Sequence, residues 1–147
     1  MTDDHRINIA DWQADQASLL AVRLEVFVEE QGVPLELEVD QHDPLATHLL
    51  ALDTEDRPIG SARLLANGQI GRMAVRRQHR HQGVGRALLR AALQLARQQG
   101  LPAVFLHAQC SAEAFYAAQG FVAEGEIFDD AGIPHRLMRR ALDDQPA

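Results

Sequence analysis

The chain has 147 residues, of which 46% are hydrophobic and 24% are charged, and its formal net charge is −7. This length and balance predict one domain, residues 1–147, with enough apolar side chains for a core. No apolar run approaches the roughly 20 residues of a membrane-spanning helix. The first residues lack the basic and apolar regions of a signal peptide. The single cysteine, Cys110, excludes an intramolecular disulfide, so we expect a cytoplasmic protein with no membrane partner.

Charge is segregated along the chain. Residues 24–56 contain ten acids and no Lys or Arg, whereas residues 72–97 contain seven Arg and no acid. One surface is expected to favour cations and another anions, which suits an enzyme that joins an amine to a phosphate-bearing cofactor. The alternative, that these residues simply form solvated surfaces of opposite charge with no role in binding, explains most of the individual charges equally well. Because the whole chain is acidic and has few aromatic residues, we expect no nucleic-acid partner.

The first half of the chain predicts one helix among strands. Alternation at 6–10 predicts an edge strand, and apolar spacing predicts a helix over 16–30. The acidic stretch 33–44 contains two prolines and is expected to be a loop too polar for the core. Strands are predicted at 46–52, 59–66 and 69–75. Asn67-Gly68 joins the last two and is typical of a two-residue hairpin turn in which both residues have positive φ.

The second half predicts helices packed on a sheet. A wide apolar stripe predicts a helix over 84–99, which Gly100 ends. The apolar run 103–107 predicts a strand buried on both faces, and 111–119 predicts a helix with Ser111 near its N-cap. Segments 121–128 and 135–142 are expected to form a final hairpin, followed by a frayed tail at 143–147. This order predicts an α/β fold with a mixed sheet of about six or seven strands and about four helices.

One stretch carries the strongest functional signal. The strand that ends at Met73-Ala74-Val75 leads into Arg80-His81-Gln82-Gly83-Val84-Gly85-Arg86, where the long helix begins. A helix N-terminus offers backbone N–H groups without intrahelical partners, and the two glycines let a ligand approach closely. The segment lacks the Lys of a Walker loop and the third Gly of a dinucleotide fingerprint. It predicts a phosphate or pyrophosphate site; the alternative is a helix that merely begins at a glycine turn.

The Arg-x-x-Gly-x-Gly pattern from Arg80 to Gly85 resembles the acyl-CoA motif of the GNAT superfamily of N-acetyltransferases. The predicted element order matches the GNAT fold from Arg6 to Leu142. Residues 112–121 resemble the family's Ala-x-x-x-Tyr-x-x-x-Gly-Phe segment. A third set of residues resembles the ElaA-like branch: 23–34, Glu38-x-Asp40-x-x-Asp43, 46–49, 106–109 and 132–135.

The resemblance implies that acetyl-CoA is the co-substrate and enters a gap between the strands that end at Val75 and His107. The pantetheine arm would pair with the backbone of residues 73–75, and the amides of residues 81–86 would hold the pyrophosphate. Many relatives have Asn where this chain has Gln109. The cofactor-binding residues expected from the resemblance are Met73, Ala74, Val75, Arg80, His81, Gln82, Gly83, Val84, Gly85, Arg86, Gln109 and Phe115.

By the same resemblance, Tyr116 is the general acid that protonates the departing CoA thiolate. A phenol with a pKa near 10 keeps its proton at neutral pH and can donate it; the alternative is an aromatic residue at the edge of the core. The attacking amine must lose a proton, and the possible bases, among which the sequence does not choose, are Glu30, Asp40, His48 and His107. Direct attack needs no nucleophilic Cys110, and the histidine spacing does not indicate a metal site.

Together these features predict an N-acetyltransferase that moves an acetyl group from acetyl-CoA to a primary amine of a small molecule or peptide by direct attack. It would use no metal and act as a monomer or homodimer. The acidic residues 29–43 are expected to attract a cationic acceptor, and Glu30, Asp40 and His48 are the expected acceptor contacts. The alternative is a GNAT-fold module that binds acyl-CoA for regulation without turnover.

Overall fold

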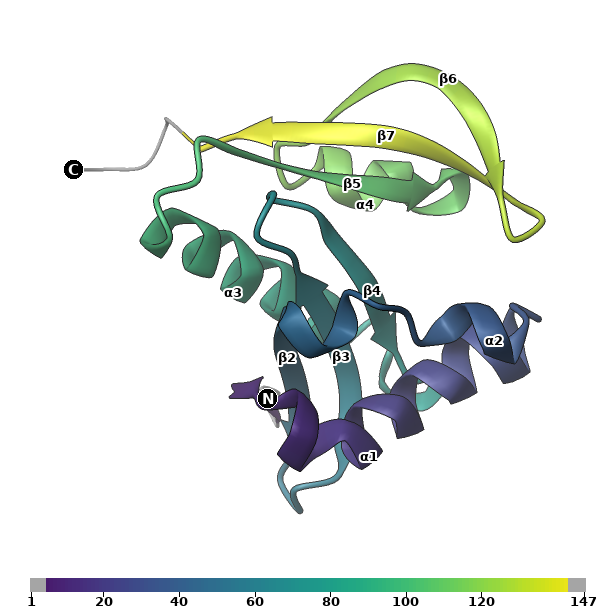
Figure 1. The fold of residues 1–147 in the computed structure, drawn as a ribbon, viewed down its shortest axis with the longest axis vertical. Coiled ribbons are helices and arrows are strands. Elements are labelled where there is room, and N and C mark those ends of the chain that lie inside the picture. The colour runs from purple at the N-terminus through teal and green to yellow at the C-terminus, as the bar shows by residue number, and fades with distance from the viewer. Residues whose placement is uncertain (1–4, 143–147) are drawn as a thin grey trace.

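The computed structural model describes residues 5–142, apart from the side chains of residues 36 and 37 (Figure 1). The tail expected at 143–147 therefore lies outside the described residues. The strands are β1 His5–Ala10, β2 Thr47–Asp53, β3 Pro58–Leu64, β4 Ile70–Val75, β5 Ala103–Gln109, β6 Val122–Asp130 and β7 Ile133–Ala141. The α-helices are α1 Trp12–Arg23, α2 Leu35–Glu38, α3 Val84–Gln98 and α4 Glu113–Ala117. A π-helical segment, η1 Leu24–Glu30, continues α1, and short 3₁₀ turns occupy η2 Asp43–Leu45, η3 Arg77–His79 and η4 Cys110–Ala112.

The strands form two antiparallel sheets that meet at one point. Their orders are β1-β2-β3-β4 and β5-β7-β6. A single parallel bridge, Gln69 with Phe105, joins the sheets beside the bond from the Phe105 N–H to the Gly68 carbonyl at 3.1 Å. Beyond it β4 and β5 diverge (Figure 1). The predicted α/β fold, its seven strands and the gap between the strands carrying Val75 and His107 are confirmed.

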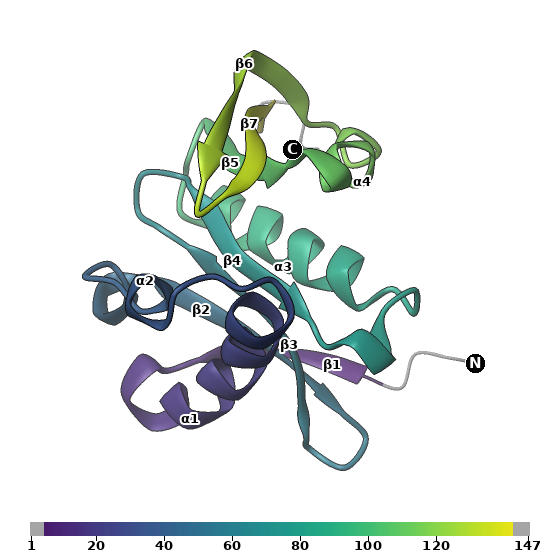
Figure 2. The same ribbon diagram turned by 90° about the vertical axis from the view of Figure 1, so that its right-hand side faces the viewer.

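Helices α1 and α3 cover opposite faces of the four-stranded sheet (Figure 2). The apolar stripe of α3, with Leu88, Leu89 and Ala92 fully buried, packs in the same core cluster as Leu49 and Val104. This burial removes apolar surface from water, at about 25 cal/mol per Å². Helix α3 thus holds β5 beside the first sheet and fixes where the two strands separate.

Several local expectations are wrong in detail. Helix α1 begins at Trp12 because the Asp11 carboxylate caps it, accepting a bond from the Ala14 N–H at 2.8 Å. Strand β5 is buried on one face only, since its other face lines a cavity described below. Gly68 has positive φ (94°) but Asn67 does not, and the bond from the Gly68 N–H to the Leu65 carbonyl closes a three-residue loop.

The helix expected over 111–119 is also shorter than expected. A 3₁₀ turn occupies Cys110–Ala112, so α4 covers only Glu113–Ala117 and its N-cap is Ala112. Ser111 is therefore not the N-cap. This short helix contacts β5 and β6, and its Tyr116 packs against the core.

The largest correction concerns residues 33–44, which the sequence assigns to a polar loop. Glu38 and Asp43 are buried, at 2% and 0% exposure. Arg23 of α1 forms ion pairs with both carboxylates, and the Arg63 Nη1 of β3 lies 3.0 Å from the Asp43 Oδ1. Opposite charges from two other elements compensate the desolvation of these acids, which is why they lie in the interior.

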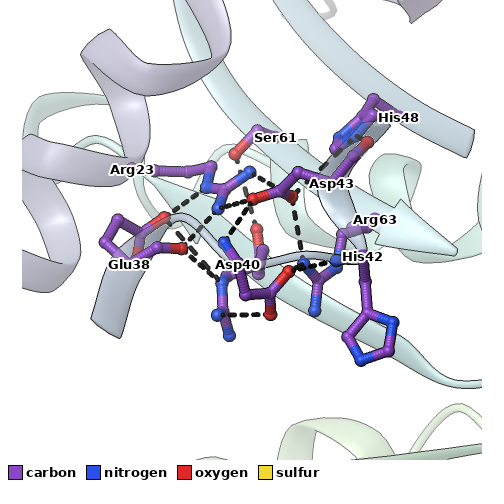
Figure 3. Close-up of polar contacts among 9 residues, drawn as sticks. Arg23, Glu38, Asp40, His42, Asp43, His48, Ser61 and Arg63 are labelled. Carbon is purple, nitrogen blue, oxygen red and sulfur yellow. Dashed lines mark hydrogen bonds and ion pairs between the residues drawn. The ribbon is translucent and has the colours of Figure 1, made fainter. Parts of the chain in front are cut away.

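We define the ion-pair network as Arg23, Glu38, Asp40, Asp43, Arg63 and Arg72 (Figure 3). Burial raises the pKa of the Asp43 carboxyl, but bonds and charges from Arg23 and Arg63 and the Asp40 backbone N–H outweigh it. They lower that pKa from 3.8 to about 2. The part of the network's stabilisation that comes from Asp43 therefore requires the ionised carboxylate.

We expect Asp43→Asn to lower the free energy of unfolding by about 3–5 kcal/mol, because it leaves buried guanidinium groups uncompensated. Since the folded pKa of Asp43 lies below its unfolded value, its stabilisation is complete above about pH 4 and is lost as the pH falls toward 2. The variant should lose this part of the pH dependence. Urea unfolding followed by circular dichroism between pH 2 and 7 measures both effects.

The matched control is Glu55→Gln. Glu55 forms an exposed ion pair with Arg57 at 3.5 Å, and such pairs contribute less than about 1 kcal/mol. If Asp43→Asn were no more destabilising than this control, the network would not be a stabilising element of the fold.

Candidate active site

A cavity of about 460 Å³ lies in the gap between the two sheets. Residues 70–73 of β4 and 106, 107 and 109 of β5 form its two long walls. The lining also includes Phe27 of η1, Gln31 just after η1, Tyr116 of α4 and residues around the turn of the β6–β7 hairpin. The strand divergence seen in the backbone therefore leaves a space large enough for a small molecule.

Strand β4 carries a bulge where it borders the cavity. The register shifts between Ser61 and Arg63, so that Arg72 and Met73 together stand opposite Ala62. Arg72 has φ of 47°, which is unfavourable for a residue with a Cβ. Its side chain donates to the Glu38 carbonyl at 3.0 Å and to the Asp40 carboxylate at 3.0 Å. These bonds hold the bulge, and bulges are common beside active sites because they redirect a strand.

The glycine loop that the sequence predicts to bind phosphate leads directly into α3. Gly83 is the N-cap of α3 with φ of 86°, and the first helical bond runs from the Ala87 N–H to the Gly83 carbonyl at 3.0 Å. The amides of residues 84–86 precede this donor, as the first N–H groups of a helix do. A Cβ at Gly83 would meet no atom within 4 Å, and the first turn of α3 contains no acid. This open, positively polarised end fits a phosphate-bearing group such as the pyrophosphate of acyl-CoA.

Arg80 joins three elements beside this loop. Its Nε donates to the Val75 carbonyl at 2.9 Å, and its two terminal nitrogens each lie 2.7 Å from a Glu30 carboxylate oxygen. The bonds from Arg80 lower the pKa of Glu30. A carboxylate held in this way accepts a proton poorly, and Glu30 does not line the cavity. The placement argues against Glu30 as the base or as an acceptor contact.

Tyr116 reaches the cavity from α4, with its hydroxyl 3.7 Å from the Met73 sulfur of β4. Burial raises the pKa of Tyr116 to about 12, so the phenol keeps its proton at neutral pH. The Phe115 ring stands edge-on to the Tyr116 ring at 5.0 Å, and a Cβ at Gly85 would lie 3.6 Å from Phe115. Phe115 therefore lies at the start of α3, between the glycine loop and the cavity.

Two other predicted residues on β5 face the cavity. The His107 side chain is exposed and stands edge-on to Phe128, with ring centroids 5.2 Å apart. The Gln109 amide donates to the Gln31 side-chain oxygen at 2.8 Å and so connects β5 to η1. His107 is thus the predicted base candidate that the structure places in the cavity wall.

The remaining predicted acceptor contacts lie elsewhere. His48 is 1% exposed, its Nε2 lies 2.8 Å from the Asp43 carbonyl, and its ring stacks on Trp12. Burial lowers the pKa of His48. Asp40 bonds to Arg63 and Arg72. The acids expected to attract a cationic acceptor are therefore largely neutralised by arginines, which argues against that expectation.

Sequence reasoning missed several residues of the cavity lining, namely Gln31, Arg63, Arg72, Asp130 and His135. For Arg63 a signal existed, because an arginine in the middle of a strand of small and apolar residues needs a partner or a polar cavity.

Cys110 is a poor nucleophile, since burial and the bond to Glu113 raise its pKa. No group of three potential metal ligands occurs among residues 5–142, and no helix in that range is long and apolar enough to cross a membrane.

Comparisons with known proteins agree with this architecture. The family model of the acetyltransferase (GNAT) domain matches residues 12–142. A protein of Bacillus subtilis described as an acetyltransferase is 34% identical over 137 residues, covering 89% of this chain and 92% of the relative. The N-acetyltransferase YjcF of the same organism is 37% identical over 123 residues, covering 81% and 87%.

Solved structures give the same result. An acyl-CoA N-acyltransferase from Pseudomonas aeruginosa has a TM-score of 0.84 at 35% identity, covering 93% of this chain and 99% of that chain. Escherichia coli ElaA has a TM-score of 0.82 at 27% identity, covering 92% and 99%. The resemblance seen in the glycine loop, the tyrosine segment and the ElaA-like residues is confirmed, and the chain belongs to the GNAT family of acyltransferases.

Proposed function

We propose that this protein is an N-acetyltransferase that transfers the acetyl group of acetyl-CoA to a primary amine by direct attack. The main supporting observation is that the β4 bulge and Tyr116 line one cavity, and that Phe115, next to Tyr116, lies close to Gly85 at the start of α3. Acetyl-CoA supplies the activated thioester. The chain supplies its binding, the positioning of the two reactants and the proton transfers.

The binding role is proposed for the strand and loop of the acyl-CoA motif. Met73 lines the cavity and begins the segment 73–75, and Gly83 borders open space at the start of α3. Phe115 and Gln109 flank the same region. The Arg80 side chain, bonded to Val75 and Glu30, positions the loop relative to β4.

The proton transfers are proposed for Tyr116 and His107. Tyr116 donates its phenolic proton to the departing thiolate, a role supported by its place in the cavity and by the raised pKa. His107 of β5 accepts the proton of the attacking amine, because it is the predicted base candidate that lines the cavity. The presence of Tyr116 in the cavity also supports an enzyme over the alternative of a non-catalytic acyl-CoA-binding module, because binding alone needs no general acid.

The glycine loop gives the first test. Gly83→Ala places a Cβ on a residue with φ of 86°, which costs about 1–2 kcal/mol, and relief of that strain moves the amides that face the ligand. We expect the Kd for CoA, measured by calorimetry, to rise about tenfold.

Gly100→Ala is the matched control, because Gly100 follows the other end of α3 with φ of 76° and equally open space. Both variants should lose similar thermal stability, but Gly100→Ala should keep the wild-type Kd. An equal effect on CoA binding would show that the loop acts only through stability.

The tyrosine gives the second test. Tyr116→Phe should lower kcat by about a hundredfold or more, because the ring remains and only the proton donor is lost. The Kd for CoA should stay within about twofold. The release of free thiol with a panel of amines measures kcat. If the variant kept the wild-type kcat, Tyr116 would have a packing role and not an acid role.

The histidine gives the third test. His107→Gln should lower kcat/KM for the amine by about a hundredfold, because it removes the proposed proton acceptor from the cavity wall. The control His5→Gln, on edge strand β1 away from the cavity, should leave kcat/KM unchanged. An unaltered kcat/KM in His107→Gln would require another base.

A further inference from the structure

Arg63 is a buried cation in the cavity wall whose hydrogen bonds are incomplete. It lies in β3, is 5% exposed and lines the cavity. Its side chain reaches Asp40 and Asp43 (Figure 3) at 2.7 and 3.0 Å, and both bonds come from Nη1. The buried Nε–H has no hydrogen-bond partner among the described residues.

The unpaired position matters because of guanidinium geometry. The Nε–H and one Nη2–H point in the same direction and form the edge that binds a carboxylate with two parallel bonds. Asp40 and Asp43 do not use this edge, since both accept from Nη1. A buried donor without a partner costs about 1–3 kcal/mol, so such a group in a native structure requires an explanation.

The cross-strand neighbour of Arg63 leaves part of the cavity open. Arg63 pairs across the strands with Gly71 of β4, and cross-strand partners point to the same face of a sheet. Gly71 lines the cavity, and a Cβ there would meet no atom within 4 Å. Any larger residue at position 71 would place its side chain next to Arg63 and occupy this part of the cavity.

The surrounding charges favour an anion over a second cation. Within the ion-pair network the arginines Arg23, Arg63 and Arg72 balance the acids Glu38, Asp40 and Asp43. Arg72 also lines the cavity, and about a quarter of its side chain is exposed. The cavity wall therefore offers guanidinium donors beside the acids Glu38 and Asp130. Of the network's acids, Glu38 is paired with Arg23, Asp40 is held by two arginines and Asp43 does not line the cavity.

We propose that the acceptor amine carries a free carboxylate, which the Nε–Nη2 edge of Arg63 binds while the amine faces the thioester. This inference rests on the proposed function and narrows its substrate class to amino acids and similar amino carboxylates. Arg63 is then a residue that determines acceptor specificity. A peptide whose α-carboxylate is blocked as an amide lacks the group recognised.

The test compares amines in pairs that differ only in the carboxylate, for example phenylalanine with phenethylamine and β-alanine with ethylamine. With acetyl-CoA and thiol detection, the carboxylated member should have a kcat/KM higher by about tenfold to a hundredfold, the range for hydrogen bonds to a charged group. The difference should lie mainly in KM. Equal values within both pairs would overturn the proposal.

The variant Arg63→Lys keeps the charge of the ion-pair network but removes the two-bond edge. It should raise the KM of the carboxylated amine to that of its partner and leave the KM for acetyl-CoA unchanged. Arg57→Lys, in the exposed β2–β3 turn, is the matched control. Gly71→Val is a second variant that keeps Arg63 and fills the adjacent space, and it should also remove the preference.

A binding measurement separates this inference from the proposed function. N-acetylphenylalanine carries the carboxylate but needs no turnover, and calorimetry with CoA-bound protein should show its binding lost in Arg63→Lys and kept in Arg57→Lys. If no amine released thiol but this pattern held, the transferase would be wrong and the carboxylate site right. If amines without a carboxylate reacted equally well and the probe did not bind, the carboxylate site would be wrong and the transferase right.

Discussion

The structure depends on a set of buried ion pairs between the N-terminal helix and the sheet. Arg23 and Arg63 surround Asp43, and Glu38 lies against Arg23 (Figure 3). Burying a charge is costly unless an opposite charge and hydrogen bonds compensate it. The segment between η1 and β2 can therefore fold only where α1 and β3 both present their arginines. This requirement fixes one wall of the cavity.

The same network extends into the cavity through Arg72. Its bonds to the Glu38 carbonyl and the Asp40 carboxylate secure a backbone conformation that a residue with a Cβ seldom adopts. The network thus connects the segment after η1 with the bulge in β4. A residue set that resembles a family signature in the sequence has in the structure a physical role, which is to place the strand edge beside the site.

The glycine loop and the cavity have different proposed roles: the loop binds phosphate, and the cavity holds the groups that transfer protons. The proposed role of the loop depends on its backbone, because the first amides of α3 have no intrahelical partners and Gly83 borders open space. The proposed role of the cavity depends on side chains, because Tyr116 of raised pKa and His107 both line it. A phosphate needs many weak donors, whereas proton transfer needs single groups at defined positions. The two strands diverge after Gln69 and Phe105, and the cavity lies between them.

The sequence by itself determined the features that depend on local interactions. Apolar period, glycine position and turn residues predicted β1 to β7, helix α3 and the glycine loop, because each depends on neighbours a few residues away. The tyrosine segment and the loop also sufficed to indicate the family, as the match over 12–142 confirms. The predicted roles of Tyr116 and His107 are consistent with their places in the cavity and stay predictions.

Only the tertiary structure determined which charged residues are buried and which of them form ion pairs. The sequence predicts a solvated loop for the acidic stretch 33–44. Its partners Arg23, Arg63 and Arg72 lie on other elements and become its neighbours only when the chain folds. The same holds for His48, which packing against Trp12 removes from the site, and for Glu30, which Arg80 binds. Electrostatic interactions depend on the distance between charges in space and on their burial. Neither quantity can be read from the order of residues in the sequence.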